Sequence, residues 1–416
     1  MAVELQERSN TFRQFALKRA VELKQMVTPY INNSRTIPTG LSLSKVYESR
    51  RANILSYFGA TLEDWENWHW QMTNRITDPD ALIALLPGLT SDQCEEIERV
   101  GKTFRWAVSP YYLSLMSDTD SLDPIRLQGL PTIAELDEDF GEEDPMGEGI
   151  TSPAPGITRR YPDRLIINVT NMCAMYCRHC QRRRNIGETD THTPRTQLKA
   201  ALDYIRANPE IRDVLVTGGD ALLLSDLTLD WLLGELHAIP HVEIKRLGTR
   251  APVTLPMRIT DELCSILAKY PPLYINTQFN HPKEVTEDAK KAADRLISAG
   301  VVLGNQAVLL KGINHQPEVM KKLNQELLKI RVRPYYIFHA KNVKGTRHFV
   351  PRIQDGLAVM DQLRGYTSGL AVPTYIINAP KGGGKTPILP QYLMDLNENK
   401  AVLRTWEGKL VQYETP

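Results

Sequence analysis

The sequence predicts an α/β fold whose centre is a partial, TIM-like (β/α)6 barrel. Apolar, β-branched runs recur from Arg164 onward, and helical stretches separate them. Strands that alternate with helices in this way indicate parallel βα units, because a parallel connection needs a long crossover. The expected strands cover 165–170, 214–217, 242–247, 273–278, 301–310 and 333–339, with a final strand at 374–378. The expected helices cover about 195–207, 225–238, 260–269, 286–299, 317–330 and 354–364.

Four regions are expected along the 416 residues. Residues 1–120 form an N-terminal helical region, in which capping boxes at Thr61 and Thr90 begin helices. An acidic and then Pro/Gly-rich stretch, 121–163, is a linker that wraps onto the barrel. The barrel and a C-terminal strand with a glycine-rich segment follow, at 164–370 and 371–416.

Composition and charge limit the class of protein. The chain is 42% hydrophobic and 24% charged, which is ordinary for a soluble globular protein. Its net charge of +1 gives no electrostatic case for a nucleic-acid or membrane partner, and no apolar run reaches the roughly 20 residues of a spanning helix. The N-terminus lacks a signal-peptide core, and five cysteines, three of them clustered, do not look like a disulfide framework. We therefore expect a reduced, cytoplasmic protein.

Three cysteines follow the first predicted strand, as Cys173, Cys177 and Cys180. Their thiolates can hold three irons of a four-iron cluster. Because such clusters normally have four cysteine ligands, one iron would stay open to an outside ligand. The alternative is a structural zinc with His179 as the fourth ligand, although structural zinc usually takes its ligands from two separated pairs.

The second predicted strand is followed by Gly218-Gly219-Asp220, where glycines allow a close backbone approach and Asp220 adds a carboxylate. Together with the Cys-x3-Cys-x2-Cys loop, this segment resembles the radical S-adenosylmethionine enzymes, over 164–340. The resemblance implies a [4Fe–4S] cluster on the three cysteines, with S-adenosyl-L-methionine on the open iron and a 5′-deoxyadenosyl radical that takes hydrogen from the substrate. It also implies S-adenosylmethionine contacts from the glycine-rich segment, Gln278 and Gln306.

Further segments resemble the lysine 2,3-aminomutase group of that family. In the group, the lysine of a segment like Gly382-Gly-Gly-Lys385-Thr-Pro forms a Schiff base with pyridoxal 5′-phosphate, so the resemblance implies this role for Lys385. It also implies that Arg160, Tyr161 and Arg164 line the coenzyme, and that Arg182 pairs with the α-carboxylate of the substrate. The other similar segments are 158–164, 172–184, 216–224, 276–282, 304–310 and 331–336.

Two positions depart from the lysine enzymes, in which two aspartates neutralise the ε-ammonium of bound lysine. By resemblance, Lys341 and Asn378 stand at these positions. At about 4 Å and an effective dielectric constant of about 20, Lys341 would repel a second ammonium by roughly 4 kcal/mol, or about a thousandfold in affinity. A carboxylate would be attracted instead, with Asn378 donating a hydrogen bond. The expected reaction is a 1,2-amino migration that converts L-glutamate to β-glutamate (3-aminopentanedioate).

Several alternatives stay open. The enzyme could be a mutase for free or protein-bound lysine. Separately, Lys341 could point to solvent beside Lys344 and Arg347 and have no part in the site. A P-loop ending at Lys385 would need glycine at position 379, where the chain has alanine. RNA modification would explain the basic run of Arg178, Arg182, Arg183 and Arg184, but no RNA-binding motif accompanies it.

The resemblance also bears on partners and metals. It implies an electron donor such as flavodoxin or ferredoxin, and a homo-oligomer that is a dimer or a tetramer. We expect no zinc, because the lysine enzymes carry a C-terminal cysteine cluster and this chain has no cysteine after Cys264.

Overall fold

The computed structural model describes residues 2–137 and 139–414, and its internal contacts divide the chain into two units, Met1–Pro38 and Thr39–Pro416. The first unit is built on one helix, α1 (Ala2–Ser34). The second unit holds the sheet and all residues of the site described below. None of the described helices has the length and apolar character needed to cross a membrane.

Short helices precede the sheet in the second unit. They are α2 (Ser44–Phe58), α3 (Leu62–Glu66), α4 (Trp68–Thr73), α5 (Pro79–Leu85), α6 (Ser91–Gly101), α7 (Pro110–Ser114) and α8 (Arg126–Gly129). The predicted capping boxes at Thr61 and Thr90 are confirmed, and they begin α3 and α6. Each threonine side chain accepts a hydrogen bond from the backbone N–H three residues on, which satisfies a donor that the helix leaves free.

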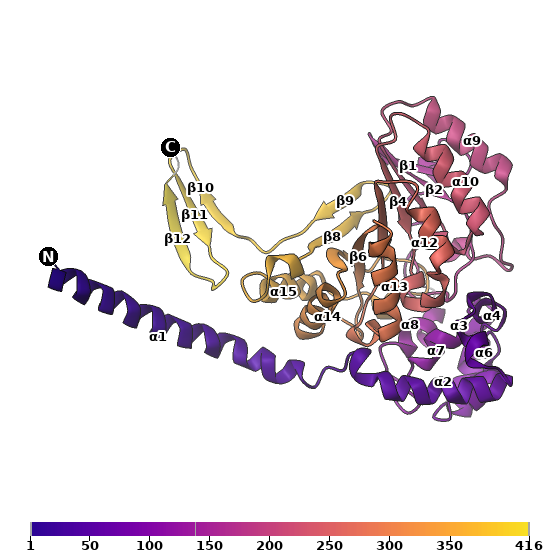
Figure 1. The fold of residues 1–416 in the computed structure, drawn as a ribbon, viewed down its shortest axis with the longest axis horizontal. Helices are drawn as coiled ribbons and strands as arrows, with labels where there is room; N and C mark the ends of the chain where they lie inside the picture. The colour runs from indigo at the N-terminus through magenta and orange to yellow at the C-terminus, as the bar shows by residue number, and fades with distance from the viewer. Residues whose placement is uncertain (1, 138, 415–416) are drawn as a thin grey trace. The chain divides into compact units, whose positions relative to one another are not determined.

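A nine-stranded sheet forms the centre of the second unit (Figure 1). Its strands pair in chain order, with β2 to β8 parallel and with β1 and β9 antiparallel at the two edges. The parallel part corresponds to the six predicted βα units and the predicted last strand, so the partial barrel is confirmed. The strands are β1 (Ile157–Tyr161), β2 (Arg164–Asn168), β3 (Asp213–Thr217), β4 (Ile244–Gly248), β5 (Leu273–Thr277), β6 (Val302–Leu309), β7 (Arg333–His339), β8 (Thr374–Ala379) and β9 (Gly384–Pro387).

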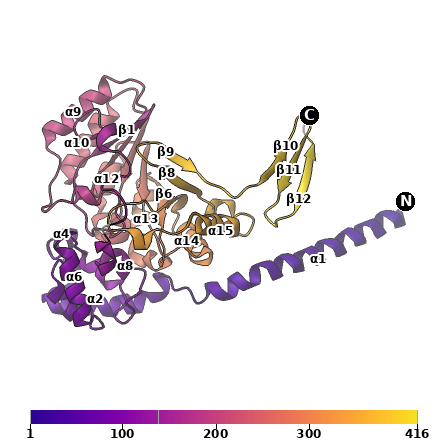
Figure 2. The same cartoon turned by 180° about the vertical axis from the view of Figure 1, so that it is seen from behind.

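Helices cover the outer face of this curved sheet (Figures 1 and 2). They are α9 (Arg195–Arg206), α10 (Asp226–His237), α11 (Ala251–Thr254), α12 (Asp261–Leu267), α13 (Glu287–Ser298), α14 (Pro317–Lys329) and α15 (Ile353–Leu363). Leu165 and Ile167 of β2 share one buried cluster with Leu198 and Leu202 of α9. These apolar contacts hold the helices against the sheet. The loops at the carboxyl ends of the strands take no part in this packing and can carry a site.

Five strands lie where the sequence predicts none. β1 falls in the expected linker: Pro162 and Asp163 form the turn between Tyr161 and Arg164, which folds the polar run 157–161 back onto β2. β9 carries the glycine-rich segment. Neither β1 nor β9 contains an apolar run of the kind by which the parallel strands were predicted. A separate antiparallel sheet consists of β10 (Leu393–Leu396), β11 (Lys400–Arg404) and β12 (Leu410–Glu414). The region boundaries at 120, 163 and 370 stay a prediction.

Candidate active site

One cavity at the carboxyl ends of the strands brings together all fifteen residues that the sequence singles out. Helices α9, α10, α12, α13, α14 and α15 contribute none of its lining, which comes from strands and the loops around them. The site residues are Arg160, Tyr161, Arg164, Cys173, Cys177, Cys180, Arg182, Gly218, Gly219, Asp220, Gln278, Gln306, Lys341, Asn378 and Lys385.

The cysteine loop and the Gly-Gly-Asp segment lie side by side because of strand register. Asn168, the last residue of β2, pairs with Thr217, the last residue of β3, so the two segments begin at the same level. The backbone N–H of Asp220 donates to the carbonyl of Met172 at 2.8 Å. A Cβ atom at Gly218 would lie 2.5 Å from the backbone oxygen of Thr170, which lies between β2 and the cysteines. Gly218 also has a φ of 133°. Glycine is therefore needed here for the two segments to touch.

The three cysteine thiols have different surroundings. Cys177 Sγ accepts a hydrogen bond from Arg250 Nη1 at 2.8 Å, and Cys180 Sγ accepts one from the backbone N–H of Arg182 at 3.4 Å. Burial raises the pKa of the Cys173 and Cys180 thiols. Three thiols on one loop that line the same cavity are a donor set that fits a cluster with three protein ligands.

The zinc interpretation, with His179 as a ligand, gains no support from the geometry. His179 Nε2 lies 3.0 Å from Gln278 Nε2 and is therefore engaged with a side chain. Among the described side chains, those of residues 11–137 and 139–414, no three from His, Cys, Asp or Glu converge as they would around one metal ion.

Gln306, on β6, lines the same cavity as Gln278.

The Asp220 carboxylate is tied to the end of the next strand. One oxygen accepts hydrogen bonds from Thr249 Oγ1 at 2.6 Å and from the backbone N–H of Leu222 at 3.0 Å, and the other accepts from the backbone N–H of Arg250 at 2.8 Å. Burial raises the pKa of Asp220, while these hydrogen bonds act to lower it. The carboxylate is thus occupied within the protein, and a contact of Asp220 with S-adenosylmethionine stays a prediction.

Glu148 is a site residue that the sequence did not reveal. Its buried carboxylate lies 2.8 Å from Arg182 Nη2, 3.0 Å from Arg184 Nη2 and 3.8 Å from Arg160 Nη2. Burial alone would raise the pKa of Glu148, but the arginines, led by Arg182, hold it below the usual value. No local motif marks Glu148, because its partners lie in other segments of the chain.

Lys385 and Asn378 are direct partners across the antiparallel pair of β8 and β9. Paired residues of this kind place their side chains on the same face, and both side chains line the cavity. The backbone N–H of Lys385 donates to the Tyr161 hydroxyl at 2.8 Å. Because β1 and β9 are the two edges of the sheet, this hydrogen bond links the two edges of the open barrel.

The Lys385 amine lies among aromatic rings and arginines. Its Nζ is 5.1 Å from the ring centroid of Tyr336 and 5.7 Å from that of Phe338. Burial, reinforced by Arg246 and Arg164, lowers the pKa of Lys385 to about 8. More of this amine is neutral at pH 7 than in an ordinary lysine, which suits a nucleophile. Its place in a strand, with no helix following directly, argues against the P-loop interpretation.

Lys341 follows β7 and lines the cavity. Its Nζ lies 5.1 Å from the ring centroid of Phe338, the ring that Lys385 also approaches. Burial, followed by the charges of Arg182 and Arg160, lowers the pKa of Lys341 to about 7. An anion beside Lys341 would stabilise its charged form.

Asn378 Nδ2 is buried and has no hydrogen-bond partner among the described residues. An unpaired buried donor costs about 1–3 kcal/mol, which a carboxylate in the cavity would relieve. The cavity lining includes seven lysines or arginines, and Asp220 is its one acidic residue. Arg160 and Arg182 already face Glu148, and Arg250 faces Glu284, so the positive charge that a ligand meets is smaller than this count.

Comparisons with known proteins identify the family of the chain. The family model of the radical SAM superfamily matches residues 167–323, and that of lysine-2,3-aminomutase matches residues 360–416. A glutamate 2,3-aminomutase of Clostridioides difficile (strain 630) is 58% identical over 405 residues, which cover 97% of this chain and 96% of the relative. L-lysine 2,3-aminomutases are 48% identical in Clostridium subterminale, over 85% of both chains, and 46% identical in Bacillus subtilis (strain 168), over 85% of this chain and 75% of the relative. The chain therefore belongs to the lysine 2,3-aminomutase family of radical S-adenosylmethionine enzymes.

Proposed function

We propose that this protein is a glutamate 2,3-aminomutase, an isomerase that moves the amino group of L-glutamate from C2 to C3 and yields β-glutamate. The observation that carries the choice of substrate is the pair of Lys341 and Asn378, which presents one cation and one unpaired amide donor to the cavity. A γ-carboxylate would satisfy both groups. The ε-ammonium of lysine would satisfy neither.

Membership of the radical S-adenosylmethionine family implies S-adenosyl-L-methionine and a [4Fe–4S] cluster. We assign the cluster to Cys173, Cys177 and Cys180. When bound, cluster and S-adenosylmethionine supply a carbon radical that abstracts hydrogen, and pyridoxal 5′-phosphate supplies a carbonyl carbon and a ring that delocalises electrons during migration.

Lys385 is the residue that would hold pyridoxal phosphate. Its lowered pKa favours the neutral amine that attacks an aldehyde. Arg160, Tyr161 and Arg164 line the cavity near it, and arginines can make paired hydrogen bonds to a phosphate group. Gly218, Gly219, Asp220, Gln278 and Gln306 remain our candidates for S-adenosylmethionine.

The protein's own part in the reaction is to hold the substrate at both ends. Arg182 binds the α-carboxylate, while Lys341 Nζ and Asn378 Nδ2 bind the γ-carboxylate, so that C2 and C3 are fixed between them. Arg182 is already held by Glu148, which fixes the direction of its guanidinium. Such fixed geometry lowers the entropy cost of reaching the reactive arrangement.

Partners follow from the same proposal. A radical enzyme of this kind needs a reductant, and we propose a flavodoxin or a ferredoxin in a reduced, cytoplasmic setting. We also propose a homo-oligomer that is a dimer or a tetramer.

The test is a product assay under strictly anaerobic conditions. Protein reconstituted with iron, sulfide and pyridoxal phosphate, then given S-adenosylmethionine and dithionite, should convert L-glutamate to β-glutamate. Formation of β-lysine from L-lysine, with no turnover of glutamate, would contradict the substrate and leave the family assignment intact.

A further inference from the structure

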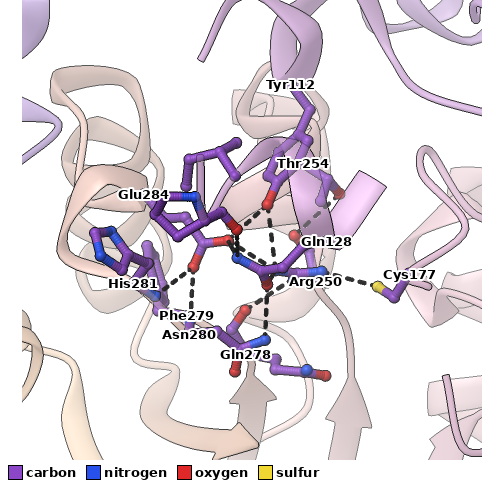
Figure 3. Close-up of polar contacts among 12 residues, drawn as sticks. Tyr112, Gln128, Cys177, Arg250, Thr254, Gln278, Phe279, Asn280, His281 and Glu284 are labelled. Atoms are coloured by element: carbon purple, nitrogen blue, oxygen red, sulfur yellow. Dashed lines mark hydrogen bonds and ion pairs between the residues drawn. The ribbon is translucent and has the colours of Figure 1, made fainter. Parts of the chain in front are cut away.

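Arg250 is a buried cation that the proposed reaction does not use for substrate or coenzyme. It follows β4, and 8% of its surface is exposed. Its Nη1 donates to Cys177 Sγ at 2.8 Å, and its Nε donates to the backbone carbonyl of Gln278 at 3.0 Å. Figure 3 shows the guanidinium between Cys177 and Glu284.

The guanidinium is held on its other side by a second buried group. Arg250 Nη2 lies 2.7 Å from Glu284 Oε1 and 2.6 Å from Gln128 Oε1. Glu284 is fully buried, and it also accepts a hydrogen bond from the Tyr112 hydroxyl at 2.7 Å. Arg250 cannot turn away from Cys177 without leaving the Glu284 charge unpaired, which is costly in a protein interior.

Further contacts fix Glu284 in place. Its second oxygen accepts the backbone N–H groups of Asn280 at 2.5 Å and His281 at 3.0 Å. The backbone N–H of Arg250 donates to Asp220 at 2.8 Å, so the Gly-Gly-Asp segment holds the other end of the residue. The hydrogen bond to the sulfur is thus fixed by residues from four parts of the chain.

Cys177 is distinguished from the other two cysteines by this contact. Among the described residues, no charged side chain donates a hydrogen bond to the Sγ of Cys173 or Cys180. Hydrogen bonds to cysteine sulfur and nearby positive charge favour the reduced, more negative state of an iron–sulfur cluster, because they stabilise the added electron.

We propose that Arg250 is a positioning residue that raises the reduction potential of the cluster through its hydrogen bond and charge at Cys177. In the step concerned, one electron passes from a one-electron reductant to the cluster, and no covalent bond forms or breaks. Glu284 limits the effect, because its negative charge opposes that of Arg250. The proposal requires that the three cysteines hold the cluster, and it is independent of whether glutamate is the substrate.

The test is a redox titration of the reconstituted protein, with the reduced cluster followed by electron paramagnetic resonance in the absence of S-adenosylmethionine. Arg250→Gln should lower the midpoint potential, with a loss of tenfold or more in the reduction equilibrium, or about 59 mV for one electron. Glu284→Gln should raise the potential, because it removes the opposing charge. The double variant keeps no unpaired buried charge and should still lie below the unmodified protein.

A matched control is Arg258→Gln. Arg258 is fully buried and donates to the carbonyl of Leu222 at 2.7 Å, but it donates to no cysteine. It should lower stability and leave the potential unchanged. Equal potentials in the double variant, the Arg258 variant and the unmodified protein would overturn the proposal.

The outcomes separate this proposal from the cluster assignment. If Cys177→Ala still binds a normal amount of iron and sulfide, the assignment of the cluster is wrong. If the double variant assembles no cluster, Glu284→Gln decides, and an unchanged potential in that variant contradicts the role of Arg250.

Discussion

The two ends of the cavity are built in opposite ways. Around the cysteine loop, the Asp220 carboxylate accepts hydrogen bonds from the Thr249 hydroxyl and the backbone N–H of Arg250, and the Arg250 guanidinium is paired with Glu284. Around β7, β8 and β9, Asn378 has an unpaired donor, and burial and neighbouring charges lower the lysine pKa values. At the first end the charged side chains Asp220 and Arg250 already have partners within the protein, whereas at the second end the Asn378 donor has none among the described residues. The cysteine loop needs a fixed geometry to hold a cluster. A pocket that selects its substrate needs polar groups that are still free to bind it.

The largest effect is expected from Lys385→Ala, which removes the amine at the incomplete end. Turnover should fall by roughly 10³- to 10⁶-fold, the range seen when a covalent catalytic group is lost. The absorbance of protein-bound pyridoxal phosphate should disappear in the same variant, while iron and sulfide content stay normal. Coenzyme absorbance that survives the substitution would remove Lys385 from its role.

Next in size is a reversal of charge at the substrate pocket. Lys341→Asp with Asn378→Asp should shift the ratio of kcat/KM for glutamate and lysine toward lysine by at least on the order of 10³, the factor that corresponds to losing roughly 4 kcal/mol of repulsion. Lys344→Asp is the control, because Lys344 lies on the same loop and does not line the cavity. An unchanged preference for glutamate in the double variant would show that these positions do not select the substrate.

A stability measurement compares the two ends directly. Asp220→Ala leaves buried donors without their acceptor and should lower the free energy of unfolding of the ligand-free protein by about 3 kcal/mol. Asn378→Leu removes a donor that has no partner and should change the free energy of unfolding by less than about 1 kcal/mol. KM for glutamate should nevertheless rise about tenfold in this variant. Urea unfolding checks both values, and equal losses would contradict the distinction between the ends.

The smallest effect is a pH dependence. Since the pKa of Lys341 in the free protein is about 7, its charge is lost as pH rises through 7, and kcat/KM for glutamate should show a net fall of about tenfold per pH unit once pH exceeds about 8, where Lys385 is already neutral. Lys385, whose pKa is about 8, changes in the opposite sense because its neutral form is the reactive one. Lys341→Arg keeps its charge at all these pH values, so the falling limb should disappear. If kcat/KM still falls at high pH in the Lys341→Arg variant, the fall is caused by another titrating group and not by Lys341.

What the sequence could predict follows from how local each signal is. Cys173, Cys177 and Cys180 stand within eight residues, and Lys385 is marked by the glycines before it, so each could be found in one segment. Arg250 and Glu284 are 34 residues apart, and Gln128 is 122 residues from Arg250, so no spacing rule connects them.

The same reasoning explains the errors in the fold. The seven parallel strands carry apolar runs, which burial under helices requires. β1 is a polar edge strand, and its pairing with β2 depends on the turn at Pro162 and Asp163. The hydrogen-bond partners of the Asp220 carboxylate, Thr249 and Arg250, come from the next strand end, so the motif that marks Asp220 does not reveal them, and its predicted contact with S-adenosylmethionine stays a prediction.

The contact between Tyr161 and Lys385 has one more consequence. The wall of the barrel is a ladder of backbone hydrogen bonds everywhere except between β1 and β9, where a tyrosine hydroxyl bridges the gap to Lys385. A seam held by a side chain opens at a lower free-energy cost than a paired strand does. The residue assigned to the coenzyme therefore stands on the seam, and the cysteine loop stands on a continuous part of the wall. Opening of the barrel at this seam would then expose Lys385 to solvent while the residues around the cysteines stay packed.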